Sequence, residues 1–205
     1  MRRVTGPVFD LRNEEKEDQG VKGSERVAVY LETEKQRRFE RDFLAGWEHY
    51  ETWDTVEIGP VGPAARDYVV EEEDVLSYNR ACGETDPLMV DPEYARKHSP
   101  TGKIIAHPVF FTSICFYCVS PKGRGTWIRT PGARNPFQKI EIIEPIVVGE
   151  RISLTMKTED RWIQRGKHYI TNLFEYSAAG KLKGRAWGTL VLPSTREEVR
   201  RFAVA

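Results

Sequence analysis

Hydrophobic and polar residues are arranged differently in the two halves of the chain. Residues 108–119 form an almost uninterrupted apolar run, and a helix that is apolar on every side has to be buried. After this run, apolar and polar residues alternate, which predicts strands. The alternating stretches are residues 137–144, 151–160, 167–177 and 182–192. The pattern predicts an α+β fold in which an antiparallel sheet wraps around one buried helix.

A helix is predicted near the beginning of the chain. Residues 33–50 place Phe39, Phe43 and Trp47 on one helical face. Thr33 is followed three residues later by Gln36, which is the spacing of a capping box. The helix is therefore expected to begin at Thr33.

Shorter elements are predicted before the apolar run. Residues 67–70 have the pattern of a short strand, and residues 71–81 have the pattern of a helix that Gly83 closes. Asp91 precedes a proline, which is typical of a helix start with Asp91 as the N-cap. Residues 98–102 are expected to form a loop.

The pattern divides the chain into three parts. Residues 1–32 are polar and contain a run of charges, so we expect an extended arm, either solvated or wrapped around a partner subunit. Residues 33–195 are predicted to form one domain with an N-terminal helix. Residues 196–205 are predicted to be a C-terminal tail.

The composition is that of an ordinary globular protein. The 205 residues include 31 Lys and Arg and 31 Asp and Glu, and the formal net charge is zero. This balance gives no electrostatic reason to expect a nucleic acid or an anionic membrane as a partner. No apolar run reaches the roughly 18 residues that span a bilayer, and the first residues lack the apolar stretch of a signal peptide. We therefore expect a cytoplasmic protein.

The cysteines are Cys82, Cys115 and Cys118. An odd number of cysteines without an export signal predicts free thiols in a reducing compartment. Cys115 and Cys118 have the spacing of a redox or zinc motif, but they lie inside the apolar run and no second pair completes a tetrahedral site. We interpret them as buried helix residues and expect no metal.

The most informative segment is Tyr-Asn-Arg-Ala-Cys-Gly-Glu-Thr-Asp-Pro-Leu-Met-Val-Asp at residues 78–91, followed by Ile-Ile-Ala-His-Pro-Val-Phe-Phe at residues 104–111. It resembles the active-site segment of MaoC-like, (R)-specific enoyl-CoA hydratases, which runs Gly-Asp-x-Asn-Pro-Leu-His-x-Asp and then Ile-Ala-His-Gly or Ile-Ala-Pro-Pro. Weaker similarity continues at residues 144–150 and 165–169, the latter typical of proteins related to the dehydratase region of fungal-type fatty acid synthase. The resemblance covers about residues 45–195 and implies a hotdog fold.

The resemblance also implies a chemistry. Adding water to an α,β-unsaturated thioester requires a base for the water, an acid for the α-carbon and a donor for the thioester oxygen. Glu84 stands where the family has its catalytic Asp, and Asp86 stands where it has Asn. His107 lies at the start of the apolar helix. The resemblance therefore implies Glu84, Asp86 and His107 as catalytic residues, with Glu84 transferring the proton and either of the others orienting water or substrate.

The motif departs from the family at two positions. Met89 replaces the family's His and cannot carry a proton. Pro108 replaces the glycine whose amide serves the thioester oxygen, and proline has no N–H. The main chain of Val109 or Phe110 would then be the donor, and we expect Met89, Pro108, Val109 and Phe110 to contact substrate.

Each of these residues also has a purely structural interpretation. Glu84 and Asp86 can cap a turn and the helix after it. His107 can be a helix-start residue bonded to a carbonyl group, and Met89 can be a packing residue. These alternatives remain open in the sequence.

The function implied by the resemblance is hydration of an enoyl-CoA or dehydration of a 3-hydroxyacyl-CoA, without a cofactor other than the CoA thioester substrate. A homodimer, or a heteromer with a second hotdog subunit, would cover the edge and apolar face that one such sheet exposes. The first alternative is a non-catalytic hotdog subunit of a heteromeric hydratase. A further alternative is an acyl-CoA thioesterase, which fold alone does not exclude.

Overall fold

The computed structural model describes residues 31, 33–43, 45–59 and 61–203. Residues 1–38 and residues 39–205 form separate compact units. The predicted arm over residues 1–32 lies outside the described residues, except for residue 31. The sheet and the central helix belong to the second unit.

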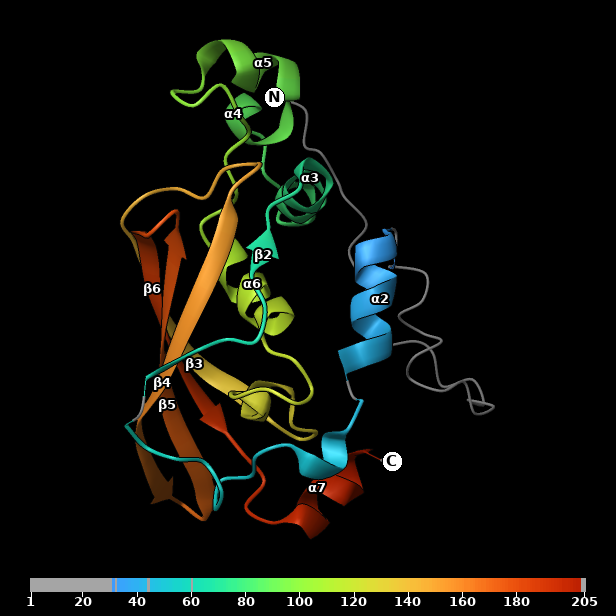
Figure 1. Cartoon of the computed structure of the whole chain (residues 1–205), viewed down its shortest axis with the longest axis vertical. Helices are drawn as coiled ribbons and strands as arrows, with labels where there is room; N and C mark the ends of the chain where they lie inside the picture. Colours follow the sequence, from blue (N-terminus) through green and yellow to red (C-terminus); the bar gives the residue numbers. More distant parts are fainter. Residues whose placement is uncertain (1–30, 32, 44, 60, 204–205) are drawn as a thin grey trace, which may run out of the picture. The chain divides into compact units, whose positions relative to one another are not determined.

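The described part of the second unit is built on one antiparallel sheet of six strands, in the order β1-β4-β5-β6-β3, with β2 also paired to β4 (Figure 1). The strands are β1 (Gly62–Pro63), β2 (Tyr68–Val69), β3 (Arg134–Ile142), β4 (Arg151–Gln164), β5 (Lys167–Ala178) and β6 (Lys181–Val191). The four longer strands match the four alternating stretches of the sequence. The predicted antiparallel sheet is confirmed.

Tight turns join the long strands. Arg165 and Gly166 between β4 and β5 have φ of 50° and 69°, and Ala179 and Gly180 between β5 and β6 have φ of 48° and 78°. Two consecutive residues with positive φ suit the right-handed twist of a hairpin. These hairpins fix the register of the strands, so every second residue is buried from Ile170 to the end of β5 and from Ile152 to Thr158 in β4.

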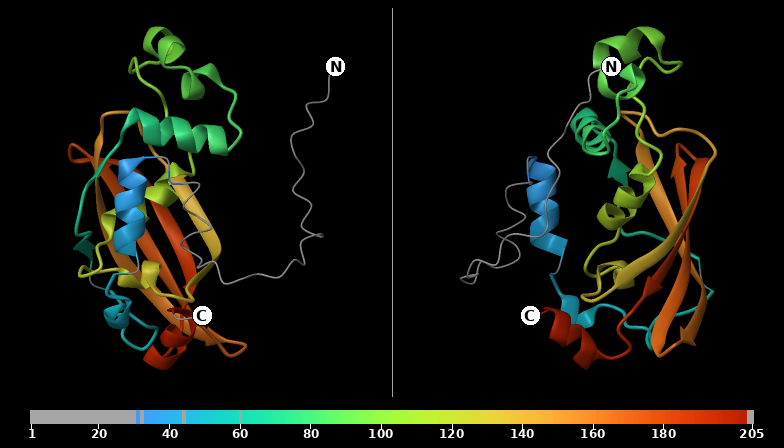
Figure 2. Two further views of the ribbon diagram at one scale, coloured as in Figure 1. Left: turned by 90° about the vertical axis from the view of Figure 1, so that its right-hand side faces the viewer. Right: turned by 180° about the vertical axis from the view of Figure 1, so that it is seen from behind.

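Helix α6 (Phe110–Cys118) is the predicted buried helix. In both views of Figure 2 it lies on the same side of the sheet as α3 (Glu72–Ala81). Phe111 is 2% exposed, and its ring meets the edge of Tyr176 of β5 at 4.9 Å between centroids. The sheet therefore curves around a helix, as the apolar run predicts.

Helix α6 begins two residues after Pro108, where the apolar run begins. Pro108 and Val109 form a turn, and Phe110 N–H donates to His107 O at 2.8 Å. His107 is therefore held outside the helix, immediately before its first turn.

The remaining helices are α2 (Glu34–Phe43), α4 (Pro87–Val90), α5 (Pro92–His98) and α7 (Arg196–Ala203), with 3-10 turns η2 (Trp47–His49) and η3 (Thr126–Arg129). The capping box of α2 is confirmed, because Thr33 N–H donates to Gln36 Oε1 at 2.9 Å and Gln36 N–H donates to Thr33 Oγ1 at 3.1 Å. The predicted helix over residues 33–50 is too long. Gly46, with φ of 81°, adopts a left-handed conformation and starts η2 instead.

The C-terminal residues assigned to a tail contain regular structure. Residues 196–203 form α7, and Val199 on this helix is fully buried. The sequence carries a signal for this helix, because Thr195 and Glu198 have the spacing of a capping box and Val199 and Phe202 lie one turn apart. The prediction of a tail over residues 196–205 is corrected accordingly.

The cysteines behave as packing residues. Cys115 and Cys118 are free and buried in α6, whereas Cys82 is free and exposed. Burial raises the pKa of each buried thiol to about 12, so neither is a thiolate near neutral pH. In the described part of the chain, no helix is long and apolar enough to cross a membrane.

Candidate functional site

Glu84 is placed by the end of α3. Gly83 has φ of 77°, and its N–H donates to Arg80 O at 3.0 Å, while Glu84 N–H donates to Asn79 O at 3.0 Å. These bonds form a Schellman motif, which needs a left-handed residue after the helix. The motif ends the helix as predicted and fixes the main chain of Glu84.

The His107 ring has a polar group beside each of its nitrogen atoms. Val109 N–H donates to His107 Nδ1 at 3.1 Å. Because Nδ1 accepts this bond, the neutral ring has to carry its proton on Nε2. The Nε2 atom lies 3.3 Å from Glu84 Oε1.

Glu84 and His107 therefore form a pair at the start of the central helix. The exposed fractions of the two side chains are 27% for Glu84 and 21% for His107. A pair that is neither buried nor fully exposed can be reached by water and by a substrate. A carboxylate also accepts several hydrogen bonds at once, so Glu84 can hold His107 and a water molecule together.

The Asp86 side chain does not join this pair but caps a helix. Its Oδ1 atom accepts the N–H of Leu88 at 2.9 Å, and Asp86 is the N-cap of α4. The residue is exposed. This geometry is that of the structural interpretation, in which an Asp caps the helix that follows it.

The four residues predicted to contact substrate lie in different surroundings. Pro108 and Val109 are exposed, Met89 is half-buried, and Phe110 is 2% exposed. The N–H groups of Val109 and Phe110 both donate within the chain, to Nδ1 and to the carbonyl oxygen of His107. Val109 is the more exposed of these two residues.

The sequence interpretation missed Asn79. This residue lies on α3 and is fully buried. It occupies the same inward face as Val75, one helical turn earlier. A polar residue on the buried face of a predicted helix is a signal that a structural or functional hydrogen bond is needed there.

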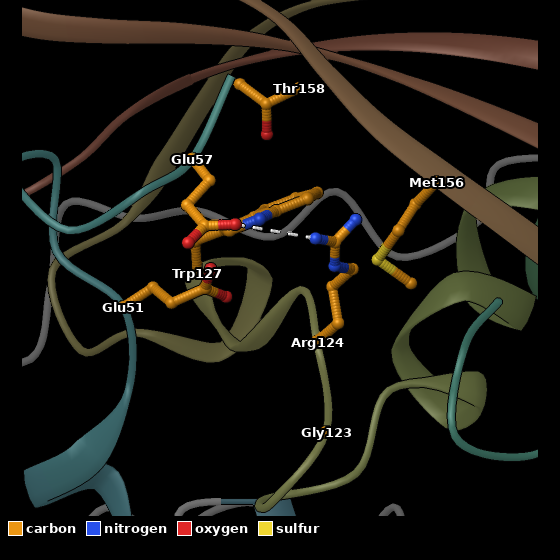
Figure 3. Close-up of a pocket in the computed structure, with 7 residues that line it drawn as sticks. All are labelled: Glu51, Glu57, Gly123, Arg124, Trp127, Met156 and Thr158. Carbon is orange, nitrogen blue, oxygen red and sulfur yellow. Dashed lines mark ion pairs between the residues drawn. The ribbon is translucent and has the colours of Figure 1, made fainter. Parts of the chain in front are cut away.

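A cavity of about 170 Å³ lies beyond the other end of α6 (Figure 3). Its lining comprises Glu51, Glu57, Gly123, Arg124, Trp127, Met156 and Thr158. Arg124 Nη2 lies 3.6 Å from Glu57 Oε2. None of the residues of the sequence motif lines this cavity.

Glu51 in this cavity acts as a cap for η3. Its Oε2 atom accepts Gly125 N–H and Thr126 Oγ1–H, each at 3.1 Å. Burial raises the pKa of its carboxyl group, and the hydrogen bonds only partly offset this effect. Glu51 therefore has a structural task that accounts for its position.

A family model gives the first comparison with known proteins. The model described as FAS1-like, dehydratase domain region, matches residues 58–176, more than half of the chain. This range includes the complete motif, the central helix and most of the long strands. Comparison with curated protein sequences gives no match.

Solved structures give the second comparison. The C-terminally truncated HadBC (3R-hydroxyacyl-ACP dehydratase) complex from Mycobacterium tuberculosis matches with a TM-score of 0.58 and 18% identity, over 67% of this chain and 98% of that one. The unliganded R-hydratase PhaJ1 from Pseudomonas aeruginosa matches with 0.55 and 15%, over 71% and 88%. The ChsH1–ChsH2 complex from Mycobacterium tuberculosis matches with 0.50 and 13%, over 74% and 91%.

These likenesses support the fold independently of the motif. A sheet wrapped around a buried helix and a family match over most of that domain agree. The chain belongs to the family described as FAS1-like, dehydratase domain region, and it has the hotdog fold that the sequence predicts.

Proposed function

We propose that this chain hydrates enoyl-CoA thioesters and dehydrates 3-hydroxyacyl-CoA thioesters. The observation that carries the proposal is the pair of Glu84 and His107, with Oε1 and Nε2 3.3 Å apart at the start of the central helix. The family to which the chain belongs consists of hydratases and dehydratases. The pair supplies a proton acceptor and an oriented imidazole where the family motif lies.

Glu84 acts as the acid and base. In hydration, a water oxygen bonds to the β-carbon while the Glu84 carboxylate accepts one water proton. The α-carbon, which gains negative charge, then takes that proton from Glu84, so the net addition is one H and one OH. Dehydration is the reverse sequence.

His107 orients the carboxylate. Its Nε2 atom lies 3.3 Å from Glu84 Oε1, so the ring sits beside one carboxylate oxygen and leaves the other for water. The role resembles that of the histidine that Met89 replaces in the family motif, but it comes from a different position in the chain. His107 therefore offers a substitute for the missing imidazole.

Val109 N–H is the donor that we assign to the thioester oxygen. Val109 is 41% exposed, whereas Phe110 is 2% exposed. The amide lies at the N-terminal end of α6, where the helix dipole favours developing negative charge. Substrate would replace the 3.1 Å bond from Val109 N–H to His107 Nδ1.

The test compares three carboxylates in one assay with a panel of enoyl-CoA and 3-hydroxyacyl-CoA thioesters. Glu84→Gln should lower kcat roughly 10²- to 10⁴-fold, the usual contribution of a general acid–base group. Asp86→Asn and Asp91→Asn should keep activity, because Asn caps helices about as well as Asp. Full activity in Glu84→Gln would refute the assignment, and loss in Asp86→Asn alone would move the role to Asp86.

Assays with the same acyl groups linked to acyl carrier protein test whether the substrate is carried by CoA or by this protein. The HadBC structure is described as a 3R-hydroxyacyl-ACP dehydratase, so this carrier is the closest alternative to CoA. A higher kcat/KM for the protein-linked substrate would replace CoA in the proposal and leave the roles of Glu84 and His107 unchanged.

A non-catalytic subunit is the second candidate function, and Met89 is the observation that favours it. Two of the similar structures are complexes of different chains. On this hypothesis the pure chain is inactive and gains activity with a hotdog partner that carries an acidic residue and a histidine. Met89→His in the chain alone gives a further test, since a gain of activity would mean that the water site is otherwise intact.

A further inference from the structure

The hydrogen bonds of Asn79 reach every segment that carries the candidate site. Its Oδ1 atom accepts His107 N–H at 2.8 Å. Its Nδ2 group donates to Met89 O at 2.7 Å and to Ile105 O at 2.9 Å. Its main-chain carbonyl accepts Glu84 N–H at 3.0 Å.

The side-chain amide of Asn79 fits its partners in one orientation only. Nδ2 faces two carbonyl groups and Oδ1 faces an N–H, so turning the amide over would oppose like groups at all three contacts. The side chain is fully buried, where a lost hydrogen bond is not replaced by bulk water. A hydrophobic residue at this position could not serve any of the three partners.

The two members of the pair need this support because they lie on separate segments. Glu84 ends the Schellman turn of α3, whereas His107 precedes α6, and the helices α4 and α5 lie between them in the chain. A contact of 3.3 Å between their side chains requires the two main chains to be fixed to within about half an ångström. Asn79 bonds to both main chains.

We infer that Asn79 is a positioning residue that holds Glu84 and His107 in register for proton transfer. The inference rests on the proposed function and adds a residue that does not touch the substrate. Asn79 acts through the two residues of the pair, and its loss lets the His107 segment shift relative to Glu84.

Asn172 provides a control that is equally buried but has fewer bonds, because among the described residues its Nδ2 atom has no hydrogen-bond partner. It is also fully buried, and its Oδ1 accepts Thr158 Oγ1–H at 2.8 Å, a bond between β5 and β4 in the sheet. Asn79→Ala and Asn172→Ala each remove a buried amide, and both should lower the free energy of unfolding. Only Asn79→Ala changes the contacts of the pair.

The kinetic test is a double-mutant cycle. Asn79→Ala should lower kcat at least about tenfold with KM within about threefold, because it disturbs orientation rather than binding. On the background of Glu84→Gln, adding Asn79→Ala should cost less than about twofold, because residues that act as a unit are not additive. A purely structural residue would instead cost the same factor on both backgrounds, as Asn172→Ala should.

The spectroscopic test does not require activity. The ring nitrogen shifts of ¹⁵N-labelled His107, measured where the ring is neutral, should show one tautomer with the proton on Nε2 in the unsubstituted chain and in Asn172→Ala. Asn79→Ala should give a mixture of tautomers. Where Asn79→Ala does not fold, Asn79→Ser replaces it, because a hydroxyl can still bond one of the three partners.

The outcomes separate the two hypotheses. An inactive chain with a single His107 tautomer that becomes mixed in Asn79→Ala would reject the proposed function and keep the positioning role. An active chain in which Asn79→Ala and Asn172→Ala have the same kcat and the same tautomer would reject the positioning role and keep the function.

Discussion

The two ends of helix α6 use polar residues for different purposes. Before its first turn, Glu84 and His107 contact each other through side chains that are 27% and 21% exposed. After its last turn, Arg129 is 1% exposed and its Nη2 donates to Phe116 O at 2.9 Å, while Arg66 Nη2 donates to Val119 O at 2.8 Å. At the first end two ionisable side chains lie beside each other near solvent, and at the second end arginine side chains donate to main-chain carbonyls of the helix end. Chemistry is therefore expected at the first end and stability at the second.

The largest effect on stability is expected at Arg129. Arg129→Ala should lower the free energy of unfolding by about 3–5 kcal/mol, because it empties a large buried volume and leaves the carbonyl of Phe116 without its donor. Arg129→Met fills most of the volume and isolates the loss of the hydrogen bond. Urea denaturation measures both. A loss below about 1 kcal/mol for Arg129→Ala would contradict the structural role of this end.

Two glycines with left-handed conformations sharpen the comparison. Gly83 and Gly125 have φ of 77° and 83°. An added Cβ at Gly83 meets nothing within 4 Å, whereas at Gly125 it overlaps the buried Sδ atom of Met156. Gly83→Ala should cost about 1–2 kcal/mol from backbone strain alone. Gly125→Ala should cost about 2–4 kcal/mol, because overpacking adds to the strain.

The measurement is thermal or urea unfolding of both glycine variants. Equal losses would mean that Met156 moves aside without cost. Gly83→Ala should also lower kcat, because Glu84 follows directly in the Schellman motif, whereas Gly125→Ala should leave kcat near its original value at a temperature where both variants are folded.

The smallest expected effect is the contribution of Glu51 to the pH dependence of the free energy of unfolding. Burial raises the pKa of Glu51 above its ordinary value of 4.5, so the folded chain binds the proton more tightly than the unfolded chain. The stability from this proton is complete below pH 4.5 and is lost as pH rises through the raised pKa. The free energy of unfolding relative to Glu51→Gln should therefore fall as pH rises. Urea denaturation between pH 4 and pH 7 measures this difference, and a flat or rising difference would contradict it.

Much of the fold could be predicted from sequence because its signals are local. The apolar run became α6, and alternation with hairpin turns such as that at Ala179 and Gly180 became the long strands. The observed boundaries of elements differ from the predicted ones where one residue changes the backbone direction, as at Gly46 with φ of 81°. Helix α7 was missed although Thr195 and Glu198 have the spacing of a capping box; what the sequence does not show is the tertiary packing that buries Val199.

The candidate site was predictable to a lesser extent. The motif identified Glu84, Asp86 and His107 as a group, but their relative positions depend on the fold between them. Asp86 turned towards Leu88 N–H, a local contact that competes with any catalytic role. Asn79 connects segments that only tertiary structure brings together. Sequence periodicity could indicate that Asn79 faces inward, but not which groups it meets.

The hydrogen bonds of Asn79 have a consequence for how the sequence between Glu84 and His107 can vary. It closes the stretch that carries α4 and α5 into a loop whose ends are tied at Glu84 and His107. The entropy of closing such a loop changes slowly with its length, by about 0.6 kcal/mol for each doubling. Insertions and substitutions on the exposed surface of α5 can therefore occur while the distance between the Glu84 and His107 side chains stays the same. The stretch between Glu84 and His107 can then vary in sequence without changing the geometry of the pair.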